Sequence, residues 1–181
     1  GRSVDSSKVG AIASSGLTGN DTVFWGWFFT ITGSFITRIV FQVGPTNQLS
    51  LTGLTIPINQ WNHLALVRSG STITVYANGV SVGSSTSSIS VNGTSNVLIA
   101  SSAYGGQYED WIIGYMSNFR IVKDTAVYTA NFTPSTTPLT AITNTSLLLS
   151  GTNAGIKDLT GLNNITTYGN AKISTSQFKY G

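Results

Sequence analysis

The chain has 181 residues, of which 40% are hydrophobic and only 8% are charged. This length suits one compact domain, and the apolar content excludes a disordered chain. The formal net charge is +3, but the nine lysines and arginines are scattered, so no basic patch indicates a nucleic-acid partner. Serine and threonine supply 49 residues, which favours strands over helices and argues against a helical bundle.

The chain contains no cysteine, which excludes disulfides and thiolate chemistry. Its longest apolar run, Val23–Phe29, is much shorter than the roughly 18 residues that a membrane-spanning helix requires. We therefore expect no membrane insertion.

Strands are predicted along most of the chain. Thr22–Ile31 is apolar on both faces, which places it inside a layered structure, and Gly26 allows another group to approach its backbone closely. Asn78-Gly79 is a strong hairpin signal, because both positions favour positive φ. The other expected strands are Ser34–Val43, Asn47–Leu51, Trp61–Arg68, Ser71–Ala77, Val80–Val82, Asn96–Ser101, Trp111–Lys123 and Thr145–Ser150.

A last hairpin is expected from Ile165–Tyr168 and Ala171–Ser174, around Gly169-Asn170. A single helical turn is expected at Thr125–Tyr128. The Ser/Thr-rich segment Ser84–Ser95 is either a loop or a short strand. Many short strands with regular turn signals predict a β-sandwich or jelly roll.

Two segments carry a family resemblance. WNHLALVRSGSTITVYANGV (Trp61–Val80) resembles a segment of laminin G-like, pentraxin-like and concanavalin A-like jelly rolls. IIGYMSNFRIVKDTAVYTANFTPSTTPL (Ile112–Leu139) is similar to the version found in phage tail and fibre proteins and surface adhesins. The resemblance implies an all-β, two-sheet antiparallel β-sandwich of the concanavalin A-like lectin/glucanase superfamily.

Large apolar residues of these segments are predicted to form the core. Trp61 and Trp111 are expected to anchor between the sheets, while Tyr76 and Tyr128 bury their rings. Arg68 and Arg120 end strands, where their guanidinium groups can bond loop carbonyls; the alternative is an arginine pair that receives an anionic sugar. The residues expected to be buried between the sheets are Trp25, Trp27, Trp61, Phe119 and Ile121.

The residues do not predict an enzyme. Glucanases of the family place two carboxylates across a glycosidic bond with a Glu-x-Asp-x-x-Glu strand. This chain has six acids, only one of them glutamate, and lacks that motif. The lone histidine, His63, alternates with core positions, which favours a packed or hydrogen-bonded role over that of a catalytic base.

Calcium is an open alternative in a chain for which no cofactor is expected. Some relatives bind calcium at the rim of the sandwich, and calcium requires six to eight oxygen ligands. The only dense acidic spot is Glu109-Asp110, which Asp158 or Asp124 could join through space.

The loop from Ala103 to Trp111 is the best candidate for binding glycans. Sugars stack on aromatic rings while amides and acids bond their hydroxyls, and the loop offers both kinds of group. The alternative is a wide hairpin loop whose tyrosines cover the edge of the core. The candidate ligand-binding residues are Tyr104, Gln107, Tyr108, Glu109 and Asp110.

The C-terminal segment 146–181 resembles the segment that usually opens a phage-type domain. We therefore interpret residues 1–181 as one laminin G-like domain in cyclically shifted register. This predicts partners that are copies of the chain itself, in a head-to-tail filament or tandem array. The alternative is that residues 146–181 fold back onto their own domain. The expected role is a structural or adhesive module at an extracellular or virion surface, or else a free-standing lectin-like domain.

Overall fold

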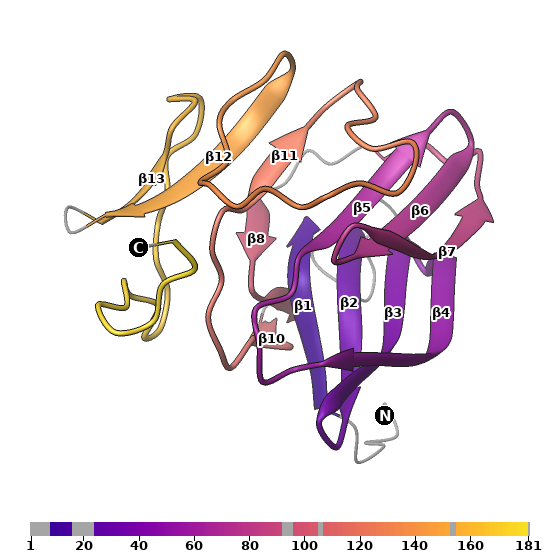
Figure 1. Cartoon of the computed structure of the whole chain (residues 1–181), viewed down its shortest axis with the longest axis horizontal. Coiled ribbons are helices and arrows are strands. Elements are labelled where there is room, and N and C mark those ends of the chain that lie inside the picture. Colours follow the sequence, from indigo (N-terminus) through magenta and orange to yellow (C-terminus); the bar gives the residue numbers. More distant parts are fainter. Residues whose placement is uncertain (1–7, 16–23, 92–95, 105–106, 153–154, 181) are drawn as a thin grey trace. The chain divides into compact units, whose positions relative to one another are not determined.

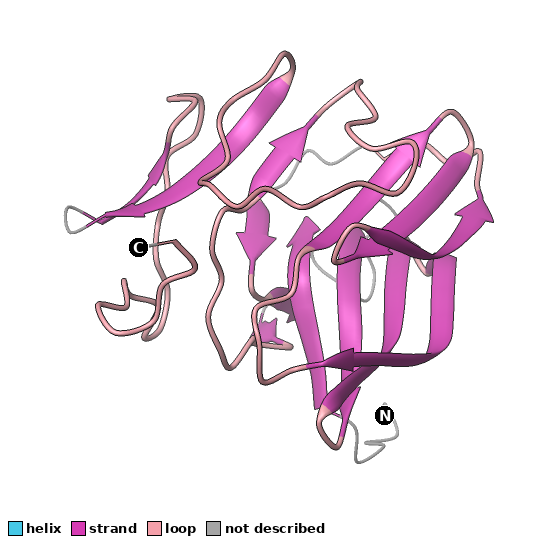
Figure 2. Cartoon of the chain, in the orientation of Figure 1, coloured by secondary structure: helices cyan, strands magenta, loops and turns pink. Residues whose placement is uncertain are grey.

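The structure is a computed structural model that describes residues 8–15, 24–91, 96–104, 107–152 and 155–180. The chain divides into two compact units, Gly1–Ile113 and Gly114–Gly181. Every regular element in the described residues is a β-strand, and the paired strands run antiparallel (Figure 1, Figure 2). The predicted all-β antiparallel fold is confirmed. The interpretation of residues 1–181 as one domain stays a prediction.

The two larger of the three sheets in the first unit form the layers of a sandwich. The larger sheet has the order β4-β3-β2-β1-β8, and the smaller has the order β5-β6-β7. β4 lies against β6 and β7, so the smaller sheet covers part of one face of the larger (Figure 1). The bounds of the larger sheet are β1 Lys8–Ser15, β2 Trp25–Thr32, β3 Phe35–Val43, β4 Thr46–Pro57 and β8 Val97–Ile99. Those of the smaller are β5 Leu64–Ser69, β6 Thr72–Ala77 and β7 Val80–Thr86.

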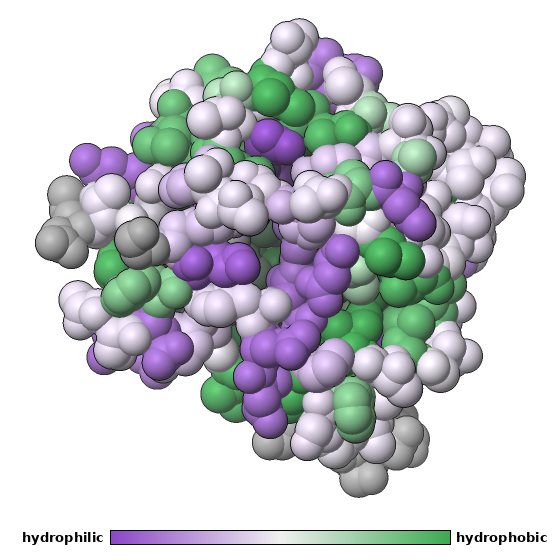
Figure 3. All heavy atoms as spheres, in the orientation of Figure 1, coloured by the Kyte–Doolittle hydropathy of each residue, from purple (hydrophilic) through white to green (hydrophobic). Residues whose placement is uncertain are grey.

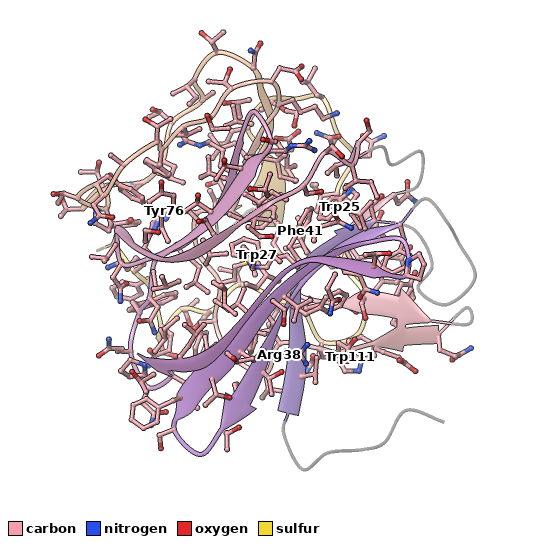
Figure 4. The ribbon with its side chains drawn as sticks, turned by 90° about the vertical axis from the view of Figure 1, so that its right-hand side faces the viewer. Trp25, Trp27, Arg38, Phe41, Tyr76 and Trp111 are labelled. Carbon is pink, nitrogen blue, oxygen red and sulfur yellow. The ribbon has the colours of Figure 1, made fainter. Side chains whose placement is uncertain are left out.

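The core of this unit follows from strand register. Phe41 lies opposite Trp27 on one side and Leu49 on the other, and all three side chains are buried. In the smaller sheet Ile73 and Val75 are buried as predicted, and burial of each such side chain stabilises the fold by about 1.5–3 kcal/mol. Figure 4 shows Trp27 and Phe41 on the side of the larger sheet that faces the layer of Tyr76.

Small residues on β1 and β2 leave room for large rings. A Cβ at Gly26 would lie 2.2 Å from Cε2 of Phe28, which confirms the close approach predicted there. A Cβ at Gly10 would lie 2.5 Å from Cζ of Phe29. β1, which has no counterpart among the predicted strands, therefore packs tightly because its side chains are small.

The hairpin between β6 and β7 confirms the Asn-Gly signal. Asn78 and Gly79 have φ values of 51° and 82°. Oδ1 of Asn78 accepts a hydrogen bond from the backbone N of His63 at 2.9 Å, and Nδ2 donates to Oδ1 of Asn62 at 3.0 Å. The Asn-Gly turn is thereby fastened to the chain that leads into β5.

The second unit is built on the sheet β11-β12-β13, with bounds Arg120–Val122, Thr145–Thr152 and Gly155–Asp158. Leu147 and Leu148 of β12 are buried. The turn after β13 is organised by Asp158, whose carboxylate accepts hydrogen bonds from Leu148 N, Thr160 and Asn163. This network gives the Asp-x-Thr-Gly-x-Asn sequence of residues 158–163 a structural role.

Several sequence-based expectations for the second half of the chain are wrong. Within Trp111–Lys123 only Arg120–Val122 is a strand, because left-handed φ values at Asp110 and Asn118, 51° and 55°, interrupt the extended path. The predicted helical turn at Thr125–Tyr128 is not formed; the Tyr128 ring instead stacks on Phe132, with centroids 3.5 Å apart. The last hairpin keeps its turn at Gly169, with a φ of 65°, but residues 165–174 contain no strand.

The predicted core was also too inclusive. Of the five residues expected between the sheets only Trp27 is buried, whereas Trp25, Trp61, Phe119 and Ile121 are half-buried. Tyr76 is buried as expected and Tyr128 is half-buried. In Ser84–Ser95, β7 continues to Thr86 and residues 87–91 are not a strand, while residues 92–95 lie outside the described residues.

Candidate functional site

The candidate loop is a short β-hairpin beside β1. It consists of β9 Ser102–Tyr104 and β10 Gln107–Glu109, and β9 lies against β1. Tyr104 is paired with Gln107, Ala103 with Tyr108 and Ser102 with Glu109. Residues 105–106, at the tip, lie outside the described residues. The loop therefore forms a hairpin, and its side chains decide what it can bind.

The hairpin distributes the predicted ligand-binding residues over two faces. Gln107 and Glu109 share one face of β10, while Tyr108 belongs to the other, because side chains alternate along a strand. All three are exposed. Tyr104 lies on the strand next to Gln107. The five predicted residues are therefore close in the chain but do not converge on one face.

Tyr108 has an aromatic neighbour that the sequence analysis assigned to the core. Its ring centroid lies 6.4 Å from that of Trp111, with 54° between the ring planes. Tyr108 is 40% exposed and Trp111 is 54% exposed. Figure 4 shows Trp111 on the side of the larger sheet opposite Trp27 and Phe41. The prediction that Trp111 anchors between the sheets is wrong, because the left-handed backbone at Asp110 turns the chain out of the sandwich before it.

The base of the hairpin is fixed by hydrogen bonds around Asp110. Its carboxylate Oδ2 accepts a hydrogen bond from Oγ of Ser102 at 2.8 Å, and Ser102 is fully buried. Its backbone oxygen accepts one from the N of Ala11 in β1, also at 2.8 Å. Oγ of Ser14, another β1 residue, donates to the oxygen of Ser101 at 3.2 Å. The base of the hairpin is thus attached to β1 of the larger sheet through several polar contacts.

The acids of the hairpin have different environments. Glu109 is exposed, whereas Asp110 is partly buried and engaged by Ser102. They are consecutive residues at the end of one strand, and Asp110 also has a positive φ. Within the described residues no three histidine or acidic side chains form a group that could hold a metal ion.

Asp158, proposed above as an additional calcium ligand, is already surrounded by donors. Burial raises the pKa of its carboxyl, but the hydrogen bonds from Thr160, Leu148 and Asn163 outweigh that effect and hold the pKa well below its usual range. Both oxygens accept hydrogen bonds, so binding a cation would displace donors that stabilise the turn.

Arg68 and Arg120 have the structural role described above, in which their guanidinium groups bond loop carbonyls. Arg68 donates from Nε to the oxygen of Gly70 at 3.0 Å and from Nη2 to that of Ser87 at 3.1 Å, and Nη1 donates to the oxygen of Ile89. Arg120 donates from Nη1 to the oxygen of Thr140 at 3.0 Å. The predicted bonds to loop carbonyls are confirmed, which favours that interpretation over an arginine pair for an anionic sugar.

Figure 3 shows one face of the molecule, on which apolar, pale and strongly hydrophilic groups are interspersed. The described part of the chain contains no helix that could span a lipid bilayer.

Comparison with known proteins identifies the family. A family model described as the concanavalin A-like lectin/glucanases superfamily matches residues 2–130. No significant match was found among curated proteins or among solved structures. The family match covers well over half of the 181 residues, including the whole segment from Trp61 to Val80. Together with the antiparallel two-layer fold, it shows that the chain belongs to the concanavalin A-like lectin/glucanase superfamily.

Proposed function

We propose that this chain is a non-enzymatic adhesive module that binds glycans through Tyr108 and Trp111. The observation that carries the proposal is the pair of adjacent, exposed rings on a hairpin anchored to the sheet. An aromatic ring that is held in place while exposed offers a stacking surface for the apolar face of a sugar at small cost in conformational entropy. Gln107 and Glu109 are next to Tyr108 in the sequence but lie on the other face of β10, so the proposal rests on the two rings alone.

The arrangement of acids supports a binding role over glycoside hydrolysis. Two catalytic carboxyl groups must face each other across the bond, roughly 5–9.5 Å apart. Glu109 and Asp110 are consecutive, and Asp110 is engaged by Ser102 and by the backbone of β1 through its own oxygen. Asp110 therefore stabilises the loop. The hairpin sequence offers no other acid as a catalytic partner for Glu109.

A glycan array with the purified chain tests this function. Tyr108→Ala and Trp111→Ala should each weaken binding roughly tenfold, because each removes one stacking surface. Both residues are well exposed, so the melting temperature should change little. Tyr115→Ala, which truncates an exposed tyrosine outside both proposed surfaces, is the matched control and should bind normally. Binding that survives both hairpin substitutions would contradict the proposal.

A second proposed role is end-to-end assembly of copies of the chain, as a filament or tandem array at an extracellular or virion surface. Four large apolar side chains in the irregular C-terminal part of the second unit are more than half exposed, namely Leu159, Leu162, Tyr168 and Phe178. Apolar groups gathered in a short segment are typical of a surface that a partner covers. We propose a second copy as the partner, because segment 146–181 resembles the segment that usually opens a domain of this type.

Light scattering at increasing concentration tests the assembly. We expect the chain to form species larger than a monomer, and Leu162→Ser to reduce them because it places a polar group on the exposed surface. Val80→Ser, at an exposed apolar position in the first unit, is the control. A monomer at all concentrations would rule out assembly of the isolated chain without affecting the glycan proposal.

A further inference from the structure

The outer face of the larger sheet, which points away from the smaller sheet, carries the cation Arg38 among hydroxyl groups. Side chains alternate along β3, so Arg38 lies on the face opposite to that of Phe41, which points towards the smaller sheet (Figure 4). The strand register places Thr30 of β2 and Thr52 of β4 directly beside Arg38. Arg38 and Thr52 are exposed and Thr30 is half-buried. The neighbours of Arg38 across the sheet are therefore hydroxyl groups and not carboxylates.

The guanidinium group of Arg38 has few partners within the chain. Its Nε and Nη2 lie 3.4 and 3.3 Å from Oγ of Ser50, longer than most hydrogen bonds from nitrogen to oxygen. A guanidinium group has five N–H donors, and within the described residues Arg38 makes no other hydrogen bond or ion pair. Arg68, by contrast, donates to three backbone oxygens. Arg38 therefore retains donors for a ligand, whereas Arg68 holds its own loop.

The sequence around Arg38 contains no acid to balance its charge. No aspartate or glutamate occurs from residue 22 to residue 108, a range that includes every strand from β2 to β9. Arg38 and Arg68 are the only lysine or arginine residues in that range. Strands β2, β3 and β4 therefore present a positive charge and no negative one, which attracts an anion that approaches this face.

The outer face also leads to the proposed aromatic site. Figure 4 shows Arg38 and Trp111 on the same side of the larger sheet. Only β2 separates β3 from β1, so at about 4.8 Å between strands Arg38 lies roughly 10 Å from β1. Asp110, which precedes Trp111, is bonded to Ala11 of β1. A short oligosaccharide that contacts Trp111 can therefore extend across β1 and β2 to Arg38.

The chemistry of this face suits an acidic sugar. A planar guanidinium group bonds a carboxylate through two parallel N–H donors and can engage the oxygens of a sulfate in the same way. The hydroxyl groups of Thr30, Ser50 and Thr52 both donate and accept hydrogen bonds, as sugar hydroxyls do. A nucleic acid would instead require several cations to neutralise its phosphates.

We propose that Arg38, with the hydroxyl groups of Thr30, Ser50 and Thr52, binds the carboxylate or sulfate of an acidic glycan. This inference rests on the proposed glycan-binding function and assigns its ligand class. Arg38 recognises the charge of the ligand, while the rings of the hairpin contact its neutral sugar units.

The test uses the intact chain on a glycan array that holds neutral oligosaccharides beside their uronic and sulfated counterparts on the same backbone. We expect the acidic members to bind better than the neutral ones, by a ratio that falls at high salt. Arg38→Gln should weaken binding of the acidic members about fivefold and change that of the neutral members less than about twofold. The uronic and sulfated arms show which anion is preferred.

Two further variants separate a site from a general effect of charge. Lys157→Gln removes an exposed cation of the second unit, so it has the same net charge as Arg38→Gln, and it should bind all members normally. Arg38→Lys keeps the charge but loses the planar fork, so it should bind acidic members with intermediate affinity. Arg38 is exposed, so its replacement should leave the melting temperature within about 2 °C. If Arg38→Gln and Lys157→Gln weaken acidic binding equally, net charge is responsible and the proposed site is wrong.

The outcomes also separate the ligand class from the aromatic site. If Arg38→Gln changes no binding while Tyr108→Ala and Trp111→Ala weaken it, the glycan-binding function stands and the acidic ligand class is wrong. If acidic glycans bind through Arg38 and neither ring variant weakens them, the Arg38 site stands and the assignment of the function to the rings fails. Binding to no glycan on the array would overturn both.

Discussion

Replacing Asp158 by alanine should destabilise the second unit by about 3 kcal/mol. The carboxylate accepts five hydrogen bonds, including those from Thr160 Oγ1 at 2.6 Å, Asn163 Nδ2 at 2.7 Å and the backbone N of Leu148 at 3.0 Å. A hydrogen bond to a charged group contributes about 1.5–3 kcal/mol, but bonds that share one acceptor group are not additive. Three of the five donors are backbone N–H groups, and that of Leu148 belongs to a buried residue of β12. Leaving the backbone N–H group of Leu148 without its acceptor is therefore the costliest part of the substitution.

The same network predicts how stability depends on pH. Because the donors hold the pKa of Asp158 well below its usual range, the folded chain binds the proton less readily than the unfolded chain. The resulting stabilisation is complete above the unfolded pKa of about 3.9 and is lost as pH falls below it towards the folded pKa. Asp158→Asn cannot titrate, so its stability should depend less on pH between about 5 and 2.

Urea unfolding followed by circular dichroism, at pH 7 and at pH 3, measures both effects. Asp124→Asn is the matched control, because Asp124 is exposed and asparagine tolerates its φ of 56°. That control should stay within about 0.5 kcal/mol of the parent chain. The reasoning fails if Asp158→Ala is as stable as the control at pH 7, or if Asp158→Asn has the same pH dependence as the parent.

Three further predictions concern the first unit and metal binding. Gly26→Ala should lower the free energy of unfolding by about 2 kcal/mol, since its Cβ would lie 2.2 Å from the Phe28 ring, and an unchanged melting temperature would contradict the packing described. Asn78→Ala should cost about 2 kcal/mol in chemical denaturation, because alanine loses the bonds to His63 and Asn62 and strains a φ of 51°, whereas Asn78→Gly should remove only the bonds. A chelator should leave the melting temperature unchanged, and a rise of several degrees with added calcium would instead point to Glu109 and Asp110.

The sequence predicted best those features that depend on local backbone chemistry. Asn78-Gly79 forms its turn because both residues adopt positive φ at little cost, a property of the residues themselves. The partner of Asn78 across the turn, Asn62, was not predicted, because it lies 16 residues away and its role depends on tertiary placement. Strand alternation likewise identified Ile73 and Val75 as buried.

Predictions that relied on residue size alone were less accurate. Trp111 was assigned to the core because a large aromatic ring is usually buried, yet it lies outside the sandwich. The determining feature is the left-handed backbone of Asp110, a non-glycine residue that gives no clear sequence signal for positive φ.

The strand that the sequence analysis missed also explains where the candidate site lies. β1 is rich in small residues, which do not produce the apolar alternation of an ordinary strand. They are small because the opposing rings fill the space: Gly10 lies against Phe29, and Ala11 is paired with Phe28. The backbone N of Ala11 in the same strand also donates to the oxygen of Asp110 at the base of the hairpin. Larger residues on β1 would therefore disturb the packing of a strand that also anchors the hairpin through its backbone, which makes this strand the physical link between the core and the proposed glycan site.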